Sequence, residues 1–190
     1  PDAPQVLEEE LDAAKDRILI GGYSLTSERV SDALIAAKSD GVTVRVVLDG
    51  APVGGVTQRQ AEQLDRLTSN NIEVRLLSGP HSRYQHHHPK YAVIDDRALV
   101  MTENFKPAGT GGMSSRGWGV AVGSSVAANG LAAIHESDRT WRAAEEWQQY
   151  REGREFAESN PAIGVFESEY EPERVNIDSA TVLTAPDNAD

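Results

Sequence analysis

The sequence predicts an α/β domain: a mixed, mostly parallel β-sheet with helices on both faces. Two observations lead to this class. Short β-branched runs alternate with amphipathic helical runs from residue 5 to residue 79, and two further strand-type runs follow a long loop. The chain has 190 residues, of which 39% are hydrophobic, enough for one well-filled core.

The first half of the chain is expected to form two β-α-β units. Glutamates near the start of the first helix suit the helix dipole, and Ser27 is the expected N-cap and Gly41 the stop of the second. The β-α-β-α-β order predicts parallel strands joined by right-handed crossovers. The expected helices are 5–16, 27–41 and 57–71, and the expected strands are 17–22, 42–50 and 72–79.

The second half is expected to add antiparallel strands and one long helix. Residues 79–89 interrupt the pattern as a loop, and the strands 90–95 and 97–101 are joined by a tight turn. A further strand is expected at 118–123, and apolar residues at three- and seven-residue spacings predict a helix over 126–150. We expect one domain over residues 1–155. Residues 156–190 are expected to form a linker that leads into a strand and turn at 180–190.

Composition narrows the function classes. The formal charge is −12 with a pI near 4.8, which argues against a broad electrostatic grip on nucleic acid or anionic lipid. With only four lysines and carboxylates spread along the chain, the sequence resembles a high-salt-adapted protein. The absence of cysteine excludes disulfides and thiolate chemistry. No signal or transmembrane segment is visible, so we expect a soluble domain whose compartment is open.

The stretch QHHHPKYAVIDD carries the most chemistry. Neighbouring histidines in a loop or strand point in different directions, so we expect no metal site, and a solvated loop is the plain alternative. His88 and Lys90, however, stand two residues apart and can reach one cleft. A neutral imidazole is a nucleophile, and an ammonium and the amide of Asn104 can hold phosphate oxygens. These residues predict metal-free phosphoryl transfer.

These residues resemble the HKD motif of the phospholipase D superfamily, in HPKYAVID followed by MTENF. The strand-helix-strand stretches before the motif and the helix that ends in SDRTW are also similar, so the resemblance covers about residues 4–147. It implies a phospholipase D-like half-domain that acts as a phosphodiester hydrolase or transferase through a phosphohistidine, without metal or cofactor.

The resemblance also implies roles for single residues. His88 would attack phosphorus, or protonate the leaving oxygen if it is the partner histidine, and we expect the first role. Lys90 and Asn104 would hold phosphate oxygens, and Asp95 would orient and polarise the motif. Thr102 would replace the serine hydroxyl of the family, and Arg116 is a candidate substrate contact.

Three departures from the family pattern stand out. Met101 and Thr102 replace the usual Gly-Ser, and the strand RGWGVAV lacks the supporting acid, although Glu103 is near in sequence. One HKD motif is present, whereas the reaction needs two histidines. The second half therefore lies in the same longer chain or in a homodimer partner, and VLTAPDNAD, which is similar to the opening of a second half, favours the longer chain.

The motif does not decide between two classes of diester substrate, nucleic acids and phospholipids. Small single-motif relatives are nucleases, which favours a nucleic-acid diester over phospholipid hydrolysis or phosphatidyl transfer. The departures motivate an alternative of another class, a degenerate HKD domain that serves as a binding or scaffold module. HKD residues read only the diester, so the natural substrate and the acceptor, water or an alcohol, are not fixed by the motif.

Overall fold

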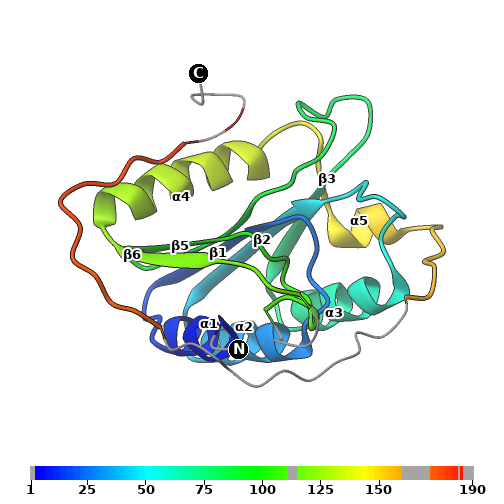
Figure 1. Cartoon of the computed structure of the whole chain (residues 1–190). Helices are drawn as coiled ribbons and strands as arrows, with labels where there is room; N and C mark the ends of the chain where they lie inside the picture. Colours follow the sequence, from blue (N-terminus) through cyan, green and yellow to red (C-terminus); the bar gives the residue numbers. More distant parts are fainter. Residues whose placement is uncertain (1–2, 111–114, 160–171, 184, 186–190) are drawn as a thin grey trace.

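A computed structural model describes residues 3–110, 115–159, 172–183 and 185. This part of the chain forms a seven-stranded sheet in the order β6-β5-β4-β1-β2-β3-β7 (Figure 1). The strands are β1 Arg17–Gly22, β2 Thr43–Asp49, β3 Glu73–Leu77, β4 Lys90–Ile94, β5 Arg97–Met101, β6 Gly119–Gly123 and β7 Ala144–Glu146. The helices are α1 Ala3–Asp12, α2 Glu28–Ser39, α3 Gln58–Ser69, α4 Ser125–Arg139 and α5 Trp147–Arg151.

The expected mixed α/β sheet with helices on both faces is confirmed. Strands β1, β2 and β3 are parallel, as the two β-α-β units require. The strands that flank them, β4, β5, β6 and β7, each pair antiparallel with their neighbours. Parallel pairing is thus limited to the first three strands, a smaller share than "mostly parallel" implies. The turn between β4 and β5, residues 95 and 96, is too short for a parallel crossover.

Helices cover the two faces unequally. In Figure 1, α1, α2 and α3 lie below the sheet and α4 lies above it. The larger core, with Ile20, Leu34 and Leu64, is on the first face, and a smaller cluster around Tyr91 and Leu131 is under α4. The Ser27 cap is confirmed, since its hydroxyl accepts from the Val30 N–H. In the described ranges, no helix is both long and apolar enough to cross a bilayer.

The single helix expected over 126–150 is wrong. Helix α4 ends at Arg139, and the chain turns into β7, which pairs with β3, before the short α5 begins. Leu131 packs in the cluster under α4, whereas Trp147 is fully buried in the core on the other face and donates from Nε1 to Asp65 (2.7 Å). The apolar spacing therefore grouped into one helix residues that pack on opposite faces of the sheet. Between Leu131 and Trp147 the chain passes from one face to the other.

The tail expected to begin a second half is only partly described. Residues 172–183 are largely exposed and form no regular structure, so the strand expected from residue 180 is wrong as far as residue 183. Residues 184 and 186–190 lie outside the described residues. The packing of the first domain reaches slightly beyond 155, since Phe156 stacks on Trp147 with ring centroids 5.5 Å apart. The domain division itself remains a prediction.

Candidate active site

One edge of the sheet gathers the candidate site. Parallel strands β1, β2 and β3 end there, and β4 begins there because Lys90 pairs with Gly22, the last residue of β1. Strand β5 runs antiparallel to β4 and so also ends at this edge. Strand ends in an open α/β sheet are where ligands usually bind, because loops rather than packed elements lie beyond them. The HKD histidine and lysine and the loop that carries Asn104 thus share one edge.

His88 and Lys90 are in direct contact. The Lys90 Nζ lies 2.9 Å from His88 Nδ1 and 3.0 Å from Nε2, and it donates to the His88 carbonyl at 2.9 Å. The lysine is buried and the histidine is exposed. Tyr23, just after β1, packs its ring edge-on to the His88 ring at 4.5 Å, and the Lys90 Nζ is 5.6 Å from the Tyr23 ring centroid. An exposed imidazole is therefore held against a buried ammonium.

The other two histidines of the run turn elsewhere. His87 is buried, with its Nδ1 3.8 Å from the Asp138 carboxylate of α4, whereas the His86 Nδ1 is 3.7 Å from Asp49. Within the ranges that the structure describes, no three His, Asp or Glu side chains are arranged to hold a metal ion. Of the three histidines, only His88 touches Lys90 in the described structure, which matches the divergence expected for adjacent loop residues.

Asp49 is a site residue that sequence reasoning missed. Its carboxylate is buried at the end of β2 and accepts from the N–H of His87 (2.5 Å) and of Ala51 (2.6 Å). Burial raises the pKa of Asp49, although the two N–H bonds oppose that shift. The aspartate anchors the loop one residue before His88. The sequence did contain an indication of it: Asp49 is the last residue of the β-branched strand VTVRVVLD, and the ends of such strands are where ligands bind.

The local electrostatics suit a neutral imidazole beside a cation. Partial burial, the Lys90 charge and His86 lower the pKa of His88, while Asp49 opposes them. Burial also lowers the pKa of Lys90, and the nearby carboxylate of Glu103 opposes that shift. Burial lowers the pKa of His87 to about 4, so this ring is neutral near pH 7. His88 is accordingly unprotonated at neutral pH, as a nucleophile must be.

The loop after β5 brings Asn104 to the same edge. Phe105 bridges to Leu25, and its carbonyl accepts from the Thr26 and Ser27 N–H groups at 2.9 and 3.0 Å. This pairing seats residues 102–105 beside the loop that follows β1. The Asn104 Oδ1 is buried and has no hydrogen-bond partner within the described part of the chain. The loop that carries Asn104 therefore lies beside the loop that follows β1, at the end of the sheet where β4 begins.

Two further sequence candidates lie less directly in the site. The Thr102 hydroxyl accepts from the Trp118 N–H at 2.9 Å and so extends the β5–β6 pairing instead of standing in for a free serine hydroxyl. Arg116 is exposed on the segment that leads into β6. Their substrate-binding roles remain predictions.

Asp95 lies at the opposite end of β4. It stands five residues after Lys90 in the chain, about 16 Å at 3.3 Å per residue. Its carboxylate accepts from the N–H groups of Lys15 (2.9 Å), Asp16 (2.8 Å) and Arg17 (2.9 Å). Although partial burial acts to raise it, the pKa of Asp95 is lowered by these bonds and the Arg17 charge. The motif's aspartate thus joins β4 to the entry of β1 and does not touch the histidine.

Replacing Asp95 with alanine is expected to destabilise the fold by about 2 kcal/mol, because three N–H groups lose a charged acceptor. Asp95 also has φ 52°, which aspartate and asparagine tolerate better than alanine, so asparagine should cost less. Urea unfolding measures both, with exposed Asp96→Ala as the control.

The same experiment has a pH signature. The folded pKa of Asp95 is below its unfolded value, so its stabilisation is present above the unfolded pKa and is lost as pH falls through the folded pKa. The difference in unfolding free energy between wild type and Asp95→Asn should shrink in that acidic range. An equal difference at pH 7 and in that acidic range would show that the carboxylate charge is irrelevant.

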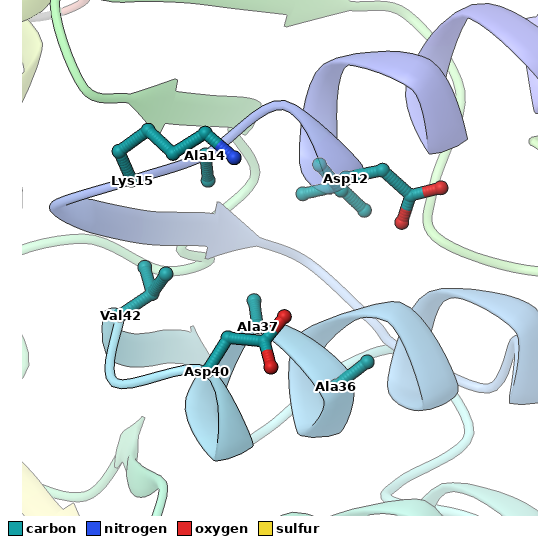
Figure 2. Close-up of a pocket in the computed structure, with 8 residues that line it drawn as sticks. Asp12, Ala14, Lys15, Ala36, Ala37, Asp40 and Val42 are labelled. Atoms are coloured by element: carbon teal, nitrogen blue, oxygen red, sulfur yellow. The ribbon is translucent and has the colours of Figure 1, made fainter.

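A cavity of about 290 Å³ lies away from this site. It opens between α1 and α2, and Figure 2 shows Asp12, Lys15 and Asp40 around it. Lys15 also donates its backbone N–H to Asp95, which places the cavity at the opposite sheet edge from His88. It therefore has no part in the chemistry of the HKD residues.

A family comparison agrees with this geometry. A family model described as "Cardiolipin synthase, PLD-like domain" matches residues 7–152, most of the chain. The chain belongs to the phospholipase D superfamily. None of the curated proteins compared with it matches it.

Solved structures of phospholipase D-like proteins share the fold. The phospholipase D family member Nuc from Salmonella typhimurium is 21% identical with a TM-score of 0.63, over 75% of this chain and 88% of that one. NucT from Helicobacter pylori is 16% identical with a TM-score of 0.64, over 76% and 91%. Phosphatidylserine synthase from Haemophilus influenzae is 14% identical with a TM-score of 0.58, over 80% of this chain but 38% of that one.

Proposed function

We propose that the protein is a metal-independent phosphodiester hydrolase or transferase that works through a phosphohistidine on His88. The observation that carries this proposal is the contact between an exposed imidazole and a buried ammonium, 2.9 Å apart, at the ligand-binding edge of a phospholipase D-like sheet. The imidazole can attack phosphorus, and the ammonium can meet the negative charge that the attack creates.

The reaction has two displacement steps. A ring nitrogen of His88 forms a bond to phosphorus, and the bond from phosphorus to the leaving oxygen breaks while a second, protonated histidine gives that oxygen its proton. The second histidine, now neutral, takes a proton from water or an alcohol. The oxygen of that acceptor then attacks phosphorus, the P–N bond breaks, and His88 leaves as a neutral imidazole.

Lys90 and Asn104 stabilise the five-coordinate transition states. The Lys90 ammonium donates to His88 when no substrate is bound, and a non-bridging phosphate oxygen replaces the ring as its acceptor. The Asn104 amide would supply a neutral donor from the loop that follows β5. Asp95 contributes through the fold alone, since its carboxylate is bound to the turn before β1.

The second histidine is supplied by another phospholipase D-like half. A second HKD motif in the same longer chain, or a second copy in a homodimer, would place its histidine across a pseudo-twofold or true twofold interface. His88 lies exposed at the sheet edge, where such a partner can reach the same phosphate. Arg116, on the neighbouring β5–β6 connection, would then contact the substrate, whereas Thr102 would hold that connection through its bond to Trp118.

We favour a nucleic-acid diester as the substrate. Small single-motif members of the superfamily and many prokaryotic two-motif members are nucleases, which favours a nucleic-acid diester over a phospholipid. The acidic surface does not oppose this preference in high salt, where screening shortens long-range repulsion.

Separate assays on two substrates test this proposal. The full protein, in high salt with EDTA, is incubated with single-stranded DNA and, separately, with phospholipid vesicles. We expect cleavage of the DNA, little release of lipid headgroup, and no loss of activity in EDTA, because no step uses a metal. Headgroup release without DNA cleavage would reassign the substrate to phospholipid.

Two further outcomes have definite meanings. Activity abolished by EDTA and restored by a divalent cation would contradict the metal-free mechanism. Binding of either substrate without turnover, unchanged in His88→Ala, would instead indicate the degenerate binding module.

A further inference from the structure

Tyr23 contacts both His88 and Lys90. It is the first residue after β1, and Gly22, just before it, pairs with Lys90 at the start of β4. The Tyr23 ring meets the His88 ring edge-on, with ring centroids 4.5 Å apart, and the Lys90 Nζ is 5.6 Å from the Tyr23 centroid. Both distances are within the usual range of aromatic and cation–π contacts. One half-buried ring therefore touches the proposed nucleophile and the ammonium beside it.

The Tyr23 side chain is fixed at both ends. Its backbone continues β1, and its hydroxyl accepts from the Val53 N–H at 2.5 Å, in the loop between β2 and α3. That loop is itself held at its start, where the Tyr150 hydroxyl donates to the Gly50 carbonyl at 2.5 Å. A ring attached at Cβ and at its hydroxyl cannot change rotamer without breaking a hydrogen bond. Tyr23 is therefore a firm wall beside His88.

The His88 ring has few other contacts. Within the described residues, two side chains hydrogen-bond to or stack on this ring, those of Lys90 and Tyr23. His88 is exposed, so its ring can change rotamer when neither side chain holds it. In the proposed mechanism the Lys90 ammonium exchanges the ring for a phosphate oxygen, and its hold on the ring ends before the attack. The contact between the two rings does not involve the ammonium and survives that exchange.

We propose that Tyr23 is a positioning residue that keeps the His88 ring in its attacking orientation while Lys90 binds the phosphate. The aromatic ring makes the contact, and the hydroxyl bond to Val53 keeps the aromatic ring in place. The effect on catalysis rests on the proposed function, whereas the hold on the His88 ring does not.

The order of the His88 ring tests the proposal without a substrate. The chain has five histidines, so their ring signals can be assigned with single His→Gln variants, and ¹³C relaxation gives an order parameter for each ring. Because Lys90 and Tyr23 each hold the ring, Lys90→Met and Tyr23→Leu should each leave it ordered. In the double variant the order parameter of the His88 ring should fall below about 0.6, the range of flexible groups.

Three outcomes would overturn the proposal. A His88 ring already disordered in Lys90→Met would show that Tyr23 does not hold it. A ring that stays ordered in the double variant would show that another group does. Loss of order at the His88 backbone N–H as well would mean that the whole loop has loosened.

Two further double variants complete this test. Lys90→Met with Tyr23→Phe keeps the aromatic ring and removes its hydroxyl, so the order of the His88 ring should lie between that of Lys90→Met and that of Lys90→Met with Tyr23→Leu. An order equal to that of Lys90→Met would reject the part of the hydroxyl. Lys90→Met with Tyr84→Leu is the matched control, because the Tyr84 ring packs on Arg83, at 5.2 Å, instead of on His88.

Cleavage of bis(4-nitrophenyl) phosphate gives an independent readout. Tyr23→Leu should lower kcat by about tenfold to a hundredfold, the cost of a slightly misplaced reacting group, with little change in KM. Tyr23→Phe should recover most of that loss because it keeps the ring. A disordered ring in the double variant with no diesterase activity in wild type would uphold the positioning and reject the proposed function. A Tyr23→Leu enzyme with the kcat of wild type would overturn the catalytic effect of the positioning.

Discussion

Replacing His88 with alanine is expected to lower diester cleavage by at least about a thousandfold, because no other group forms the covalent intermediate. Bis(4-nitrophenyl) phosphate suits the assay, since 4-nitrophenolate leaves without a general acid. If His88 were only the proton donor, its loss would spare the first step on this substrate. The expected result is therefore no burst of 4-nitrophenolate in His88→Ala.

His86→Ala is the matched control. His86 is in the same loop but faces Asp49 instead of Lys90, so its replacement should change cleavage by less than about tenfold. Thermal unfolding checks that both variants fold equally well. A His88→Ala enzyme that keeps the burst would show that another group attacks phosphorus.

Replacing Lys90 with methionine is expected to lower kcat/KM by about a hundredfold to a thousandfold, the range found when one donor to a developing oxyanion is removed. Methionine keeps the apolar stem of this buried side chain and removes the ammonium. The loss should fall mainly on kcat, because the charge on the phosphate oxygens grows in the transition state.

Lys15→Met, an exposed lysine at the opposite edge, controls for the loss of one positive charge. Removal of Lys90 also takes away a cause of the low His88 pKa, so the His88 titration should move to higher pH in Lys90→Met. A variant with normal kcat and a raised KM would mean that Lys90 binds the ground state and the transition state equally.

The fold of the first half was predictable from local sequence patterns. β-Branched strands alternate there with amphipathic helices, and the expected N-cap, Ser27, is observed to accept from the Val30 N–H. The H-x-K spacing was enough to expect His88 beside Lys90, because residues two apart in an extended segment lie on the same side; His88 stands just before β4 and is in contact with Lys90. Such features depend on residues that are close in sequence, and they can therefore be predicted from sequence patterns.

Features set by tertiary packing were not predictable. The helix expected over 126–150 breaks because Trp147 is required on the other face of the sheet, which no local period reports. Asp49 reaches the His88 loop from β2, which is distant from His88 in sequence, and accepts from the His87 N–H. Asp95 shows the reverse case, since its place in the motif did not reveal that it lies at the far end of β4.

The most direct measurement is the location of the covalent phosphate. The full protein is mixed with a ³²P-labelled diester, quenched in alkali, where a phosphoramidate bond survives, and digested for mass spectrometry. We predict that the phosphoryl adduct is on a ring nitrogen of His88 and is absent from His88→Ala. An active wild-type protein whose adduct lies on another residue, or that forms none, would contradict the proposed mechanism.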